Sequence, residues 1–467
     1  ARYILPWFGG TPAVWSTVQM IFQVLLTGGY AYTSWLAQKS RRREIVHLIL
    51  LIFSLVILIM QGLAWKSPNA TWKPQGEGSP ILGIVIILLI SVSLPYFLLS
   101  TNSPLIQFWF HRRFPEKTAY RLYALSNFGS LIGLIAYPLL VEPNFSLAWQ
   151  GRIWSILYGL FAVLTIYNVS NSLRKHSASM IAPSVAESAK PVKIHRYLYI
   201  LWISLAMVAS LLLLATTSQI TQEVAVIPFL WVLPLMIYLL SFILAFSGEQ
   251  WYSRRLFIVL LFIFTILAGW AMGRSESLSI IFQCVIYSGA LFCACMVCHG
   301  ELYRLRPSAD QLTTFYLMVS VGGALGGLFI NFVAPYLFKG FWELPLGYLL
   351  AWAVLVIISI KSRHAYSQKL KFIFDTVLML SALIVACVRL GQQVRSDLTD
   401  FLYIGRNYYG VVRVKSLGEQ GDLSSRYALV HGITIHGIQM TDPVLRDTPT
   451  AYFGETSGGG LALLHHP

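Results

Sequence analysis

Long apolar runs separated by short polar stretches occupy roughly the first 390 residues of the chain. Most runs hold about 20 residues, which is the length that a helix rising about 1.5 Å per residue needs to cross the hydrocarbon core of a bilayer. The pattern therefore predicts a mainly α fold, a polytopic bundle of about twelve transmembrane helices. The expected spans are residues 13–37, 45–65, 80–101, 120–141, 152–172, 197–217, 225–247, 255–273, 278–298, 313–337, 343–361 and 371–390.

The polar stretches between the runs alternate in charge, and this alternation predicts the orientation of the bundle. Every second stretch is rich in Lys and Arg, whereas those between hold fewer. Because basic residues collect in cytoplasmic loops, the basic stretches are expected inside, and residues 1–10 are then outside. The basic stretches are residues 38–44, 111–121, 174–196, 252–255, 303–307 and 361–371.

Two segments of the chain resemble each other. "LYALSNFGSLIGLIAYPLLVEP" (122–143) and "FYLMVSVGGALGGLFINFVAPY" (315–336) share aromatic starts, glycines four apart and a Pro near the outer end. Small residues at that spacing let helices approach closely, and repeated halves are typical of transporters. We therefore expect two similar halves in a major-facilitator-like arrangement.

The halves and their connections follow from the spans. The first half is expected at 1–173, a cytoplasmic linker at 174–196 and the second half at 197–361. Residues 362–390 form an additional membrane helix. The second half holds six spans and the first holds five, so we expect a further helix ahead of Ala1.

From about residue 391 the pattern changes to an alternation of apolar and polar positions. "NYYGVVRVKSL" (407–417), "RYALVHGITIHGIQM" (426–440) and "PTAYFGE" (449–455) follow a period of two, with Gly and Asp between them. Such runs predict short antiparallel strands. Residues 391–467 are therefore expected to form a β-subdomain.

Composition narrows the possible partners. The chain is 56% hydrophobic and 11% charged, against about 25% charged residues in soluble proteins, so the lipid bilayer is the first partner. The net charge of +15 belongs to the loops between apolar runs, and we do not expect nucleic-acid binding. Cys295, Cys298 and His299 match the spacing of c-type haem attachment. They lie at the end of an apolar run on the predicted cytoplasmic side, so neither a metal nor another cofactor is expected.

Four motifs occur in order along the chain. They are "ARYILPWFGGTPAVW" (1–15), "CHGELYRLRP" (298–307) followed by "LTTFYLMVSVGGALGG" (312–327), "RNYYGVVRV" (406–414) and "LVHGITIHGIQ" (429–439). Together they resemble the fused major-facilitator/spermidine-synthase-like membrane proteins of bacteria, over most of the chain. The resemblance implies a bacterial inner-membrane domain followed by a unit similar to polyamine aminopropyltransferases.

The same resemblance implies site residues in the tail, the small β-subdomain of the synthase-like unit. His431 stands in the place of an Asp in the synthases, His436 lies in a short insert, and Gln439 and Tyr452 are the expected substrate-facing residues. The alternative is that both histidines simply occupy alternating positions of a β-hairpin. The family's nucleotide loop and catalytic Asp are expected beyond Pro467, so decarboxylated S-adenosylmethionine is a co-substrate only if a complete synthase domain follows.

Four polar residues stand out in the membrane part. His299, Glu301 and Arg304 are ionisable groups at a membrane boundary, where structural pairing and a proton or substrate site are the two interpretations. Asn127 is polar at mid-helix. It either lines a cavity or hydrogen-bonds a neighbouring helix.

Three functions remain open at this point. The resemblance implies aminopropyl transfer to a polyamine, or polyamine binding. The alternatives are an accessory subunit of a larger membrane complex with a degenerate synthase-like part, and a transporter of small cations or metabolites. The span 371–390 is expected to carry the tail to the outer face, with Asp375 and Arg389 near its two ends; a helix lying on the membrane surface would instead keep the tail inside.

Overall fold

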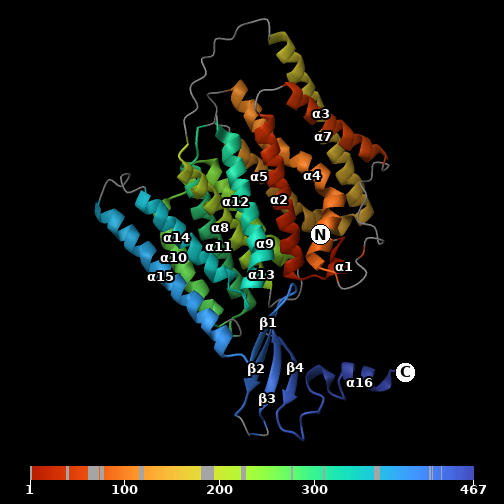
Figure 1. Ribbon diagram of the computed structural model, residues 1–467, viewed down its shortest axis with the longest axis vertical. Coiled ribbons are helices and arrows are strands. Elements are labelled where there is room, and N and C mark those ends of the chain that lie inside the picture. The colour runs from red at the N-terminus through yellow and green to blue at the C-terminus, as the bar shows by residue number, and fades with distance from the viewer. Residues whose placement is uncertain are drawn as a thin grey trace.

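Most of the chain folds into a helical bundle, and a small sheet projects from one end of it (Figure 1). The computed structural model describes the chain except residues 1–2, 38–40, 61–72, 74–77, 115–119, 180–193, 222–227, 275–276, 309–310, 362–368, 420–421, 423, 433 and 467.

Each of the twelve predicted spans coincides, over its described residues, with a long helix. Among the described residues, eleven helices are long and apolar enough to cross a membrane, and α2 is a further helix of 25 residues with more polar positions. The chain is therefore a multi-pass membrane protein. The long helices are α2 (Pro12–Leu36), α3 (Arg41–Met60), α4 (Pro80–Arg113), α5 (Tyr120–Ala136), α7 (Leu147–Ser179), α8 (Arg196–Thr221), α9 (Pro228–Ser247), α10 (Arg254–Met272), α11 (Ile280–Arg304), α12 (Leu312–Leu328), α14 (Glu343–Lys361) and α15 (Lys369–Thr399).

Short elements complete the helical part. They are α1 (Leu5–Phe8), the π-helical turn η2 (Tyr137–Val141), α6 (Glu142–Asn144), the 3-10 turn η3 (Glu249–Trp251), the π-helical turn η5 (Phe329–Val333) and α13 (Ala334–Leu337). Both repeated segments thus contain a π-helical turn near their outer end, η2 after α5 and η5 after α12.

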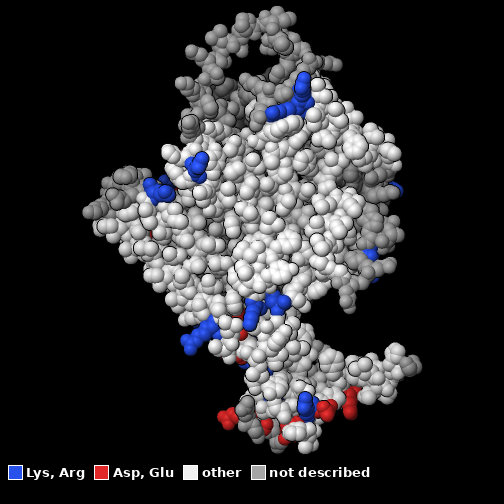
Figure 2. Space-filling view, viewed as in Figure 1, with Lys and Arg blue, Asp and Glu red and all other residues white. Residues whose placement is uncertain are grey.

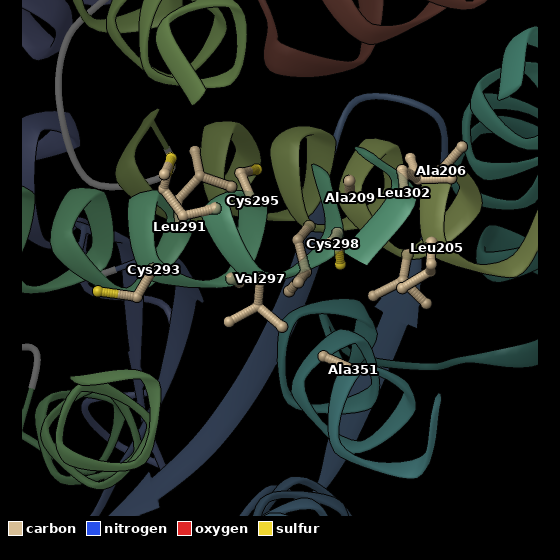
Figure 3. Packing of buried hydrophobic residues seen from close by; sticks show 14 of the residues in the cluster. Leu205, Ala206, Ala209, Leu291, Cys293, Cys295, Val297, Cys298, Leu302 and Ala351 are labelled. Atoms are coloured by element: carbon tan, nitrogen blue, oxygen red, sulfur yellow. The ribbon is translucent and has the colours of Figure 1, made fainter. Parts of the chain in front are cut away.

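The core of the bundle is built on α8 and α11. Their side chains, together with those of α12 and α14, make one large apolar cluster in which Leu205, Leu291 and Trp352 are fully buried. Figure 3 shows that Cys293, Cys295 and Cys298 lie within this cluster along α11. These cysteines are free thiols and pack as small apolar side chains.

The glycines of the second repeat explain its close packing. A Cβ at Gly322 would lie 2.3 Å from the carbonyl oxygen of Ile203 on α8, and one at Gly326 would lie 2.7 Å from that of Met207. Glycine is therefore required where α12 crosses α8, as the spacing predicted. At Gly133 of the first repeat, a Cβ would meet nothing within 4 Å.

The tail forms a four-stranded antiparallel sheet in the order β1-β2-β3-β4. The strands are β1 (Tyr403–Arg406), β2 (Val411–Leu417), β3 (Arg426–His431) and β4 (Thr434–Met440). The run 426–440 is thus a hairpin, and its turn begins at Gly432 with a φ of 62°, which glycine adopts without strain. The strand predicted at 449–455 is wrong. That segment contains the 3-10 turn η7 (Ala451–Phe453), where Ala451 has a φ of 53°, and α16 (Gly458–His465) follows it.

Helix α15 carries the chain to the sheet. It continues to Thr399, beyond the predicted end at residue 390, so the first residues of the expected β-subdomain are helical. Asp375 lies 3.7 Å from Arg255 of α10, and Arg389 packs against Gly269 of the same helix. The sheet lies at the end of the bundle opposite the start of α15 (Figure 1).

Buried ion pairs fix the sheet to the bundle. The Arg406 guanidinium pairs with Glu343 at the start of α14 and donates to the Gly340 carbonyl at 2.6 Å. Arg413 pairs with Asp397 of α15 at 3.0 Å, and Trp342 donates to the other oxygen of that carboxylate at 2.7 Å. In Figure 2 most of the visible bundle surface is uncharged, and Asp and Glu gather at the end of the tail that lies away from the bundle. The two ion pairs therefore hold the sheet and the bundle together as one packed unit.

Candidate functional site

A cavity of about 740 Å³ lies inside the bundle, and we call it the central cavity. It is lined mainly by α2, α4, α5, α9 and α12, which bring both repeated segments together. The equivalent residues Tyr123 of α5 and Tyr316 of α12 stack with ring centroids 4.5 Å apart. Its volume falls in the range of small-molecule sites, about 300–1,000 Å³.

Aromatic rings, amides and hydroxyl groups line the central cavity. Among the described lining residues there is no Lys or Arg, and Glu142 is the one charged residue. Asn127 lines the cavity as well, and its amide donates to the Tyr123 carbonyl of its own helix at 2.8 Å. The lining includes five aromatic residues and two glutamines that bear on the chemistry of the cavity: Trp15, Tyr30, Tyr96, Tyr238, Phe242, Gln19 and Gln23.

Two glutamines on one face of α2, Gln19 and Gln23, line the cavity, and their amide oxygens have no hydrogen-bond partner among the described residues. The Oε1 atoms of Gln19 and Gln23 are both buried. The amide orientation of Gln23 follows from its neighbour Ser210. The Ser210 hydroxyl donates its one hydrogen to the Gly323 carbonyl at 2.9 Å. It therefore accepts a hydrogen bond from Gln23 Nε2, which is 2.9 Å away. The unpaired atom of Gln23 is therefore an acceptor.

A second cavity, of about 400 Å³, lies between the bundle and the sheet, and we call it the vestibule. The bundle contributes Thr11, Trp231 and Phe341, and the sheet contributes Tyr408 and His431. Trp231 also lines the central cavity, so its ring forms a wall that the two cavities share.

A tight loop between β1 and β2 forms the sheet side of the vestibule. Asn407 Oδ1 accepts from the backbone N–H groups of Tyr409 and Gly410 at 2.9 and 3.1 Å, which fixes the turn. Tyr408 then reaches into the bundle, where its hydroxyl lies 3.2 Å from Thr17 Oγ1. Thr17 donates to Asn331 at 3.1 Å, so the Tyr408 hydroxyl is the donor in this contact. Burial raises the pKa of Tyr408 to about 12, so it is protonated at neutral pH.

The two tail histidines lie on one face of the sheet because of an irregularity in the register. The β3–β4 pairing slips between Leu429 and Val430, leaving His436 as an extra residue of β4. The His431 and His436 rings are 5.8 Å apart, and both border a cavity of about 330 Å³ beside Thr11. Burial, and then the neighbouring His436 and Arg413, lower the pKa of His431.

Of the other two tail residues, the structure describes the side chain of Gln439. Gln439 is exposed on β4, opposite Tyr427 of β3. The backbone of Tyr452 lies in η7, but its side chain lies outside the described part of the structure. A shared substrate pocket for Gln439 and Tyr452 stays a prediction.

Glu301 and Arg304 belong to a charge cluster at the basic end of the bundle. The Glu301 carboxylate is 2% exposed and accepts from the Tyr252 hydroxyl at 2.9 Å. Arg254 and Arg304 lie 3.2 and 3.4 Å from it. The cluster ties α11 to the start of α10, which fits the structural interpretation of these two residues.

His299 lies apart from that cluster, one layer behind the central cavity. Its ring stacks on Phe242 at 3.5 Å, and Phe242 and Tyr238 both line the cavity. The Ser241 hydroxyl donates to the Tyr238 carbonyl at 2.7 Å, so it accepts from His299 Nδ1, 2.9 Å away. Nε2 then carries the lone pair, and it has no hydrogen-bond partner among the described residues. Among those residues, no group of three or more His, Cys, Asp or Glu is arranged to hold a metal ion.

Several residues of both cavities were not predicted from the sequence. Trp15, Gln19 and Gln23 recur every four residues along one face of α2, and this polar stripe in an apolar segment was a usable signal. Trp231 and Tyr408 gave no such signal, because their role depends on the docking of the sheet.

Compared with known proteins, the chain matches no family model and no curated protein.

Proposed function

We propose that this membrane protein binds a small organic cation in the central cavity and passes it across the bilayer. The observation that carries the proposal is the chemistry of the cavity lining: its described residues include aromatic rings, amide side chains and one carboxylate, and no Lys or Arg. A carboxylate and aromatic faces, without Lys or Arg among the described lining residues, favour a positively charged ligand. An anion would need cationic or N–H-rich partners in such an apolar setting.

Aromatic rings add a second attraction for a cation. Tyr30, Tyr96, Tyr123 and Tyr238 present rings to the cavity, and a desolvated ammonium over such a ring gains about 2 kcal/mol. The resemblance to spermidine-synthase-like membrane proteins supports a polyamine as the ligand, since polyamines are flexible chains of amines.

The arrangement of helices supports a two-half transporter as the architecture. α2 packs on α12, and α5 packs on α9. In the repeat, α5 corresponds to α12, and α2 would then correspond to α9. The α5–α9 contact is then equivalent to the α12–α2 contact, with the two halves interchanged. Two halves related in this way would enclose the ligand between them, as in alternating-access transporters.

The proposed location is the bacterial inner membrane, with the sheet on the outer face. Support comes from the charge pattern: the sheet lies at the end of the bundle away from the basic stretches that begin α3 and α10. A sheet on the outer face is separated from cytosolic decarboxylated S-adenosylmethionine, which favours binding and transport over polyamine synthesis.

Uptake into proteoliposomes tests the proposal. Radiolabelled spermidine should bind the purified chain in nanodiscs and should accumulate in liposomes that contain it, with competition from putrescine and none from glutamate. Gln19→Leu replaces an amide side chain of the cavity lining by an apolar one and should weaken binding about tenfold, in line with about 1–3 kcal/mol for a lost buried hydrogen bond. The exposed Gln250 of η3 serves as the matched control, and Gln250→Leu should leave binding unchanged. Equal affinity for spermidine and glutamate, or no binding of either, would overturn the proposal.

Aminopropyl transfer in the synthase-like unit is the second candidate. The register slip in β4, which turns His436 to the face of His431, favours it, because it gathers two imidazoles beside a cavity. Incubating the protein with putrescine and decarboxylated S-adenosylmethionine distinguishes the two, since only a transferase forms spermidine and methylthioadenosine.

A further inference from the structure

Aromatic rings lie between the vestibule and the central cavity. Trp231 of α9 is 3% exposed, and it is the one described residue that borders both cavities. Trp15 of α2 faces it with ring centroids 5.8 Å apart. Trp15 also borders the central cavity, so this pair of rings stands between the two spaces.

We propose that the vestibule is a second binding compartment for the same organic cation, in series with the central cavity. The sheet forms its outer wall, and the Trp15–Trp231 pair forms the constriction between the two compartments. The proposal rests on the proposed function for the identity of the ligand, and it adds a site to which the sheet contributes directly.

The charges around the vestibule permit a cation to enter. Arg406 and His431 are the described lining residues that can be positive. The Arg406 charge is compensated by Glu343, with which it pairs, both side chains being less than 10% exposed. The pKa of His431 is lowered by burial and by His436 and Arg413, so its imidazole is neutral at pH 7. Neither group then repels an ammonium.

The vestibule also offers aromatic faces. Trp231, Phe341 and Tyr408 line it from the bundle and from the sheet. Such rings attract ammonium groups by their quadrupole. Thr11 also lines the vestibule, and its hydroxyl is buried and has no hydrogen-bond partner among the described residues.

The constriction has features that allow it to open. The indole N–H of Trp15 is buried and has no hydrogen-bond partner among the described residues, so no hydrogen bond holds that ring in place. Pro234 lies inside α9 one turn after Trp231. Proline removes one backbone hydrogen bond from a helix and permits bending. By contrast, the sheet side is fixed by the Tyr408–Thr17 contact and by the Arg406 ion pair.

Cysteine accessibility tests this arrangement. The full chain carries Cys284→Ser and Cys387→Ser, because these are the cysteines that are not buried. A cysteine is then placed in the central cavity by Ser320→Cys or in the vestibule by Ser218→Cys. Oriented proteoliposomes are treated on the sheet side with 2-(trimethylammonium)ethyl methanethiosulfonate, a cation that does not cross bilayers.

We expect the Ser218→Cys protein to react rapidly and the Ser320→Cys protein to react slowly. Adding Trp231→Ala should raise the reaction rate of the Ser320→Cys protein at least tenfold. Trp15→Ala removes the other ring of the constriction and should raise the reaction rate in the same way. This second variant keeps the test decisive if the Trp231→Ala protein does not fold. Trp149→Ala is the control, since this tryptophan is exposed and borders neither cavity; it should have no effect.

The outcomes separate this inference from the proposed function. If the Ser218→Cys protein does not react, or if neither tryptophan variant accelerates the Ser320→Cys protein, the series arrangement is wrong. Protection of the Ser218→Cys protein by spermidine supports the vestibule as a polyamine site, and lack of protection rejects it. Acceleration by Trp231→Ala without spermidine uptake would keep the path and reject the proposed function.

Discussion

Single polar residues within the apolar helices carry specific hydrogen bonds, and His299 is the clearest example. Its Nδ1–H is satisfied by Ser241 of the neighbouring helix, in a region where both residues are fully buried. The interaction fixes the imidazole tautomer and holds the Phe242 ring that lines the central cavity. The residue therefore links the α9–α11 contact to the cavity wall.

Removing this partner should destabilise the bundle. Ser241→Ala leaves the His299 N–H unpaired, and we expect a loss of about 1–3 kcal/mol, the cost of an unsatisfied buried donor. Unfolding in detergent micelles, followed by circular dichroism, measures it. Ser381→Ala is the matched control, because the Ser381 hydroxyl likewise donates to a carbonyl three residues earlier in its helix. Equal losses in both variants would show that the His299 contact contributes nothing.

The sheet should lose stability on acidification because of His431. Burial, His436 and Arg413 lower the pKa of His431 in the folded sheet. The ordinary pKa of histidine is about 6.5. Just below that pH, the unfolded chain therefore binds a proton at this residue that the folded chain does not bind. Stability therefore falls as the pH drops below 6.5, and above it the histidine has no effect. Hydrogen exchange of β3 and β4 amides at pH 7.5 and 5.5 measures this. His431→Gln should reduce the difference; an unchanged difference would contradict the assignment.

Among the helices, the contact of α12 with α8 shows how glycine spacing becomes helix packing. Gly322 and Gly326 face backbone atoms of α8, whereas Gly323 faces away from it, and a Cβ there would meet nothing within 4 Å. One helix therefore has two kinds of glycine. The first kind permits a close approach, and the second borders the central cavity.

These two kinds should respond oppositely to alanine. Gly326→Ala places a Cβ 2.7 Å from the Met207 carbonyl oxygen and should destabilise the bundle by about 1–3 kcal/mol through overpacking. Gly323→Ala should be stabilising by about 0.5–1 kcal/mol, since alanine favours the helix. Thermal unfolding of both variants in the same detergent compares them. A loss of stability at Gly323 as large as at Gly326 would argue against the packing explanation.

At the scale of the whole molecule, the sheet is joined to one end of the bundle by α15 and by buried ion pairs. Its side of the membrane decides which solutes reach the vestibule. The charge pattern of the loops predicts that this end lies on the outer face.

Labelling in intact cells should show the sheet outside. A cysteine introduced by Ser424→Cys, in the exposed turn before β3, should react with a membrane-impermeant maleimide in spheroplasts. Cys387 is exposed on α15 and is replaced beforehand. Reaction only after lysis would place the sheet in the cytoplasm, where decarboxylated S-adenosylmethionine is expected, and would favour the aminopropyltransferase hypothesis.

The sequence alone determined the helices and most of the sheet. The length of the apolar runs set the twelve helices, because backbone polar groups in a bilayer must pair within the helix. Alternation set β2, β3 and β4 for a similar reason, since side chains in a strand point to opposite faces in turn. It failed at residues 449–455, where the alternating pattern is short and the backbone at Ala451 turns to a positive φ.

Tertiary structure decided the sites. Whether Asn127 borders a cavity depends on which helix lies opposite, and hydrophobicity does not specify that in a uniformly apolar chain. The slip that turns His436 towards His431 depends on the β3–β4 pairing. Trp231 and Tyr408 border one vestibule because the sheet docks on the bundle, more than 170 residues after α9 begins. Such contacts join residues far apart in the chain, so periodicity, which relates only near neighbours, has no information about them.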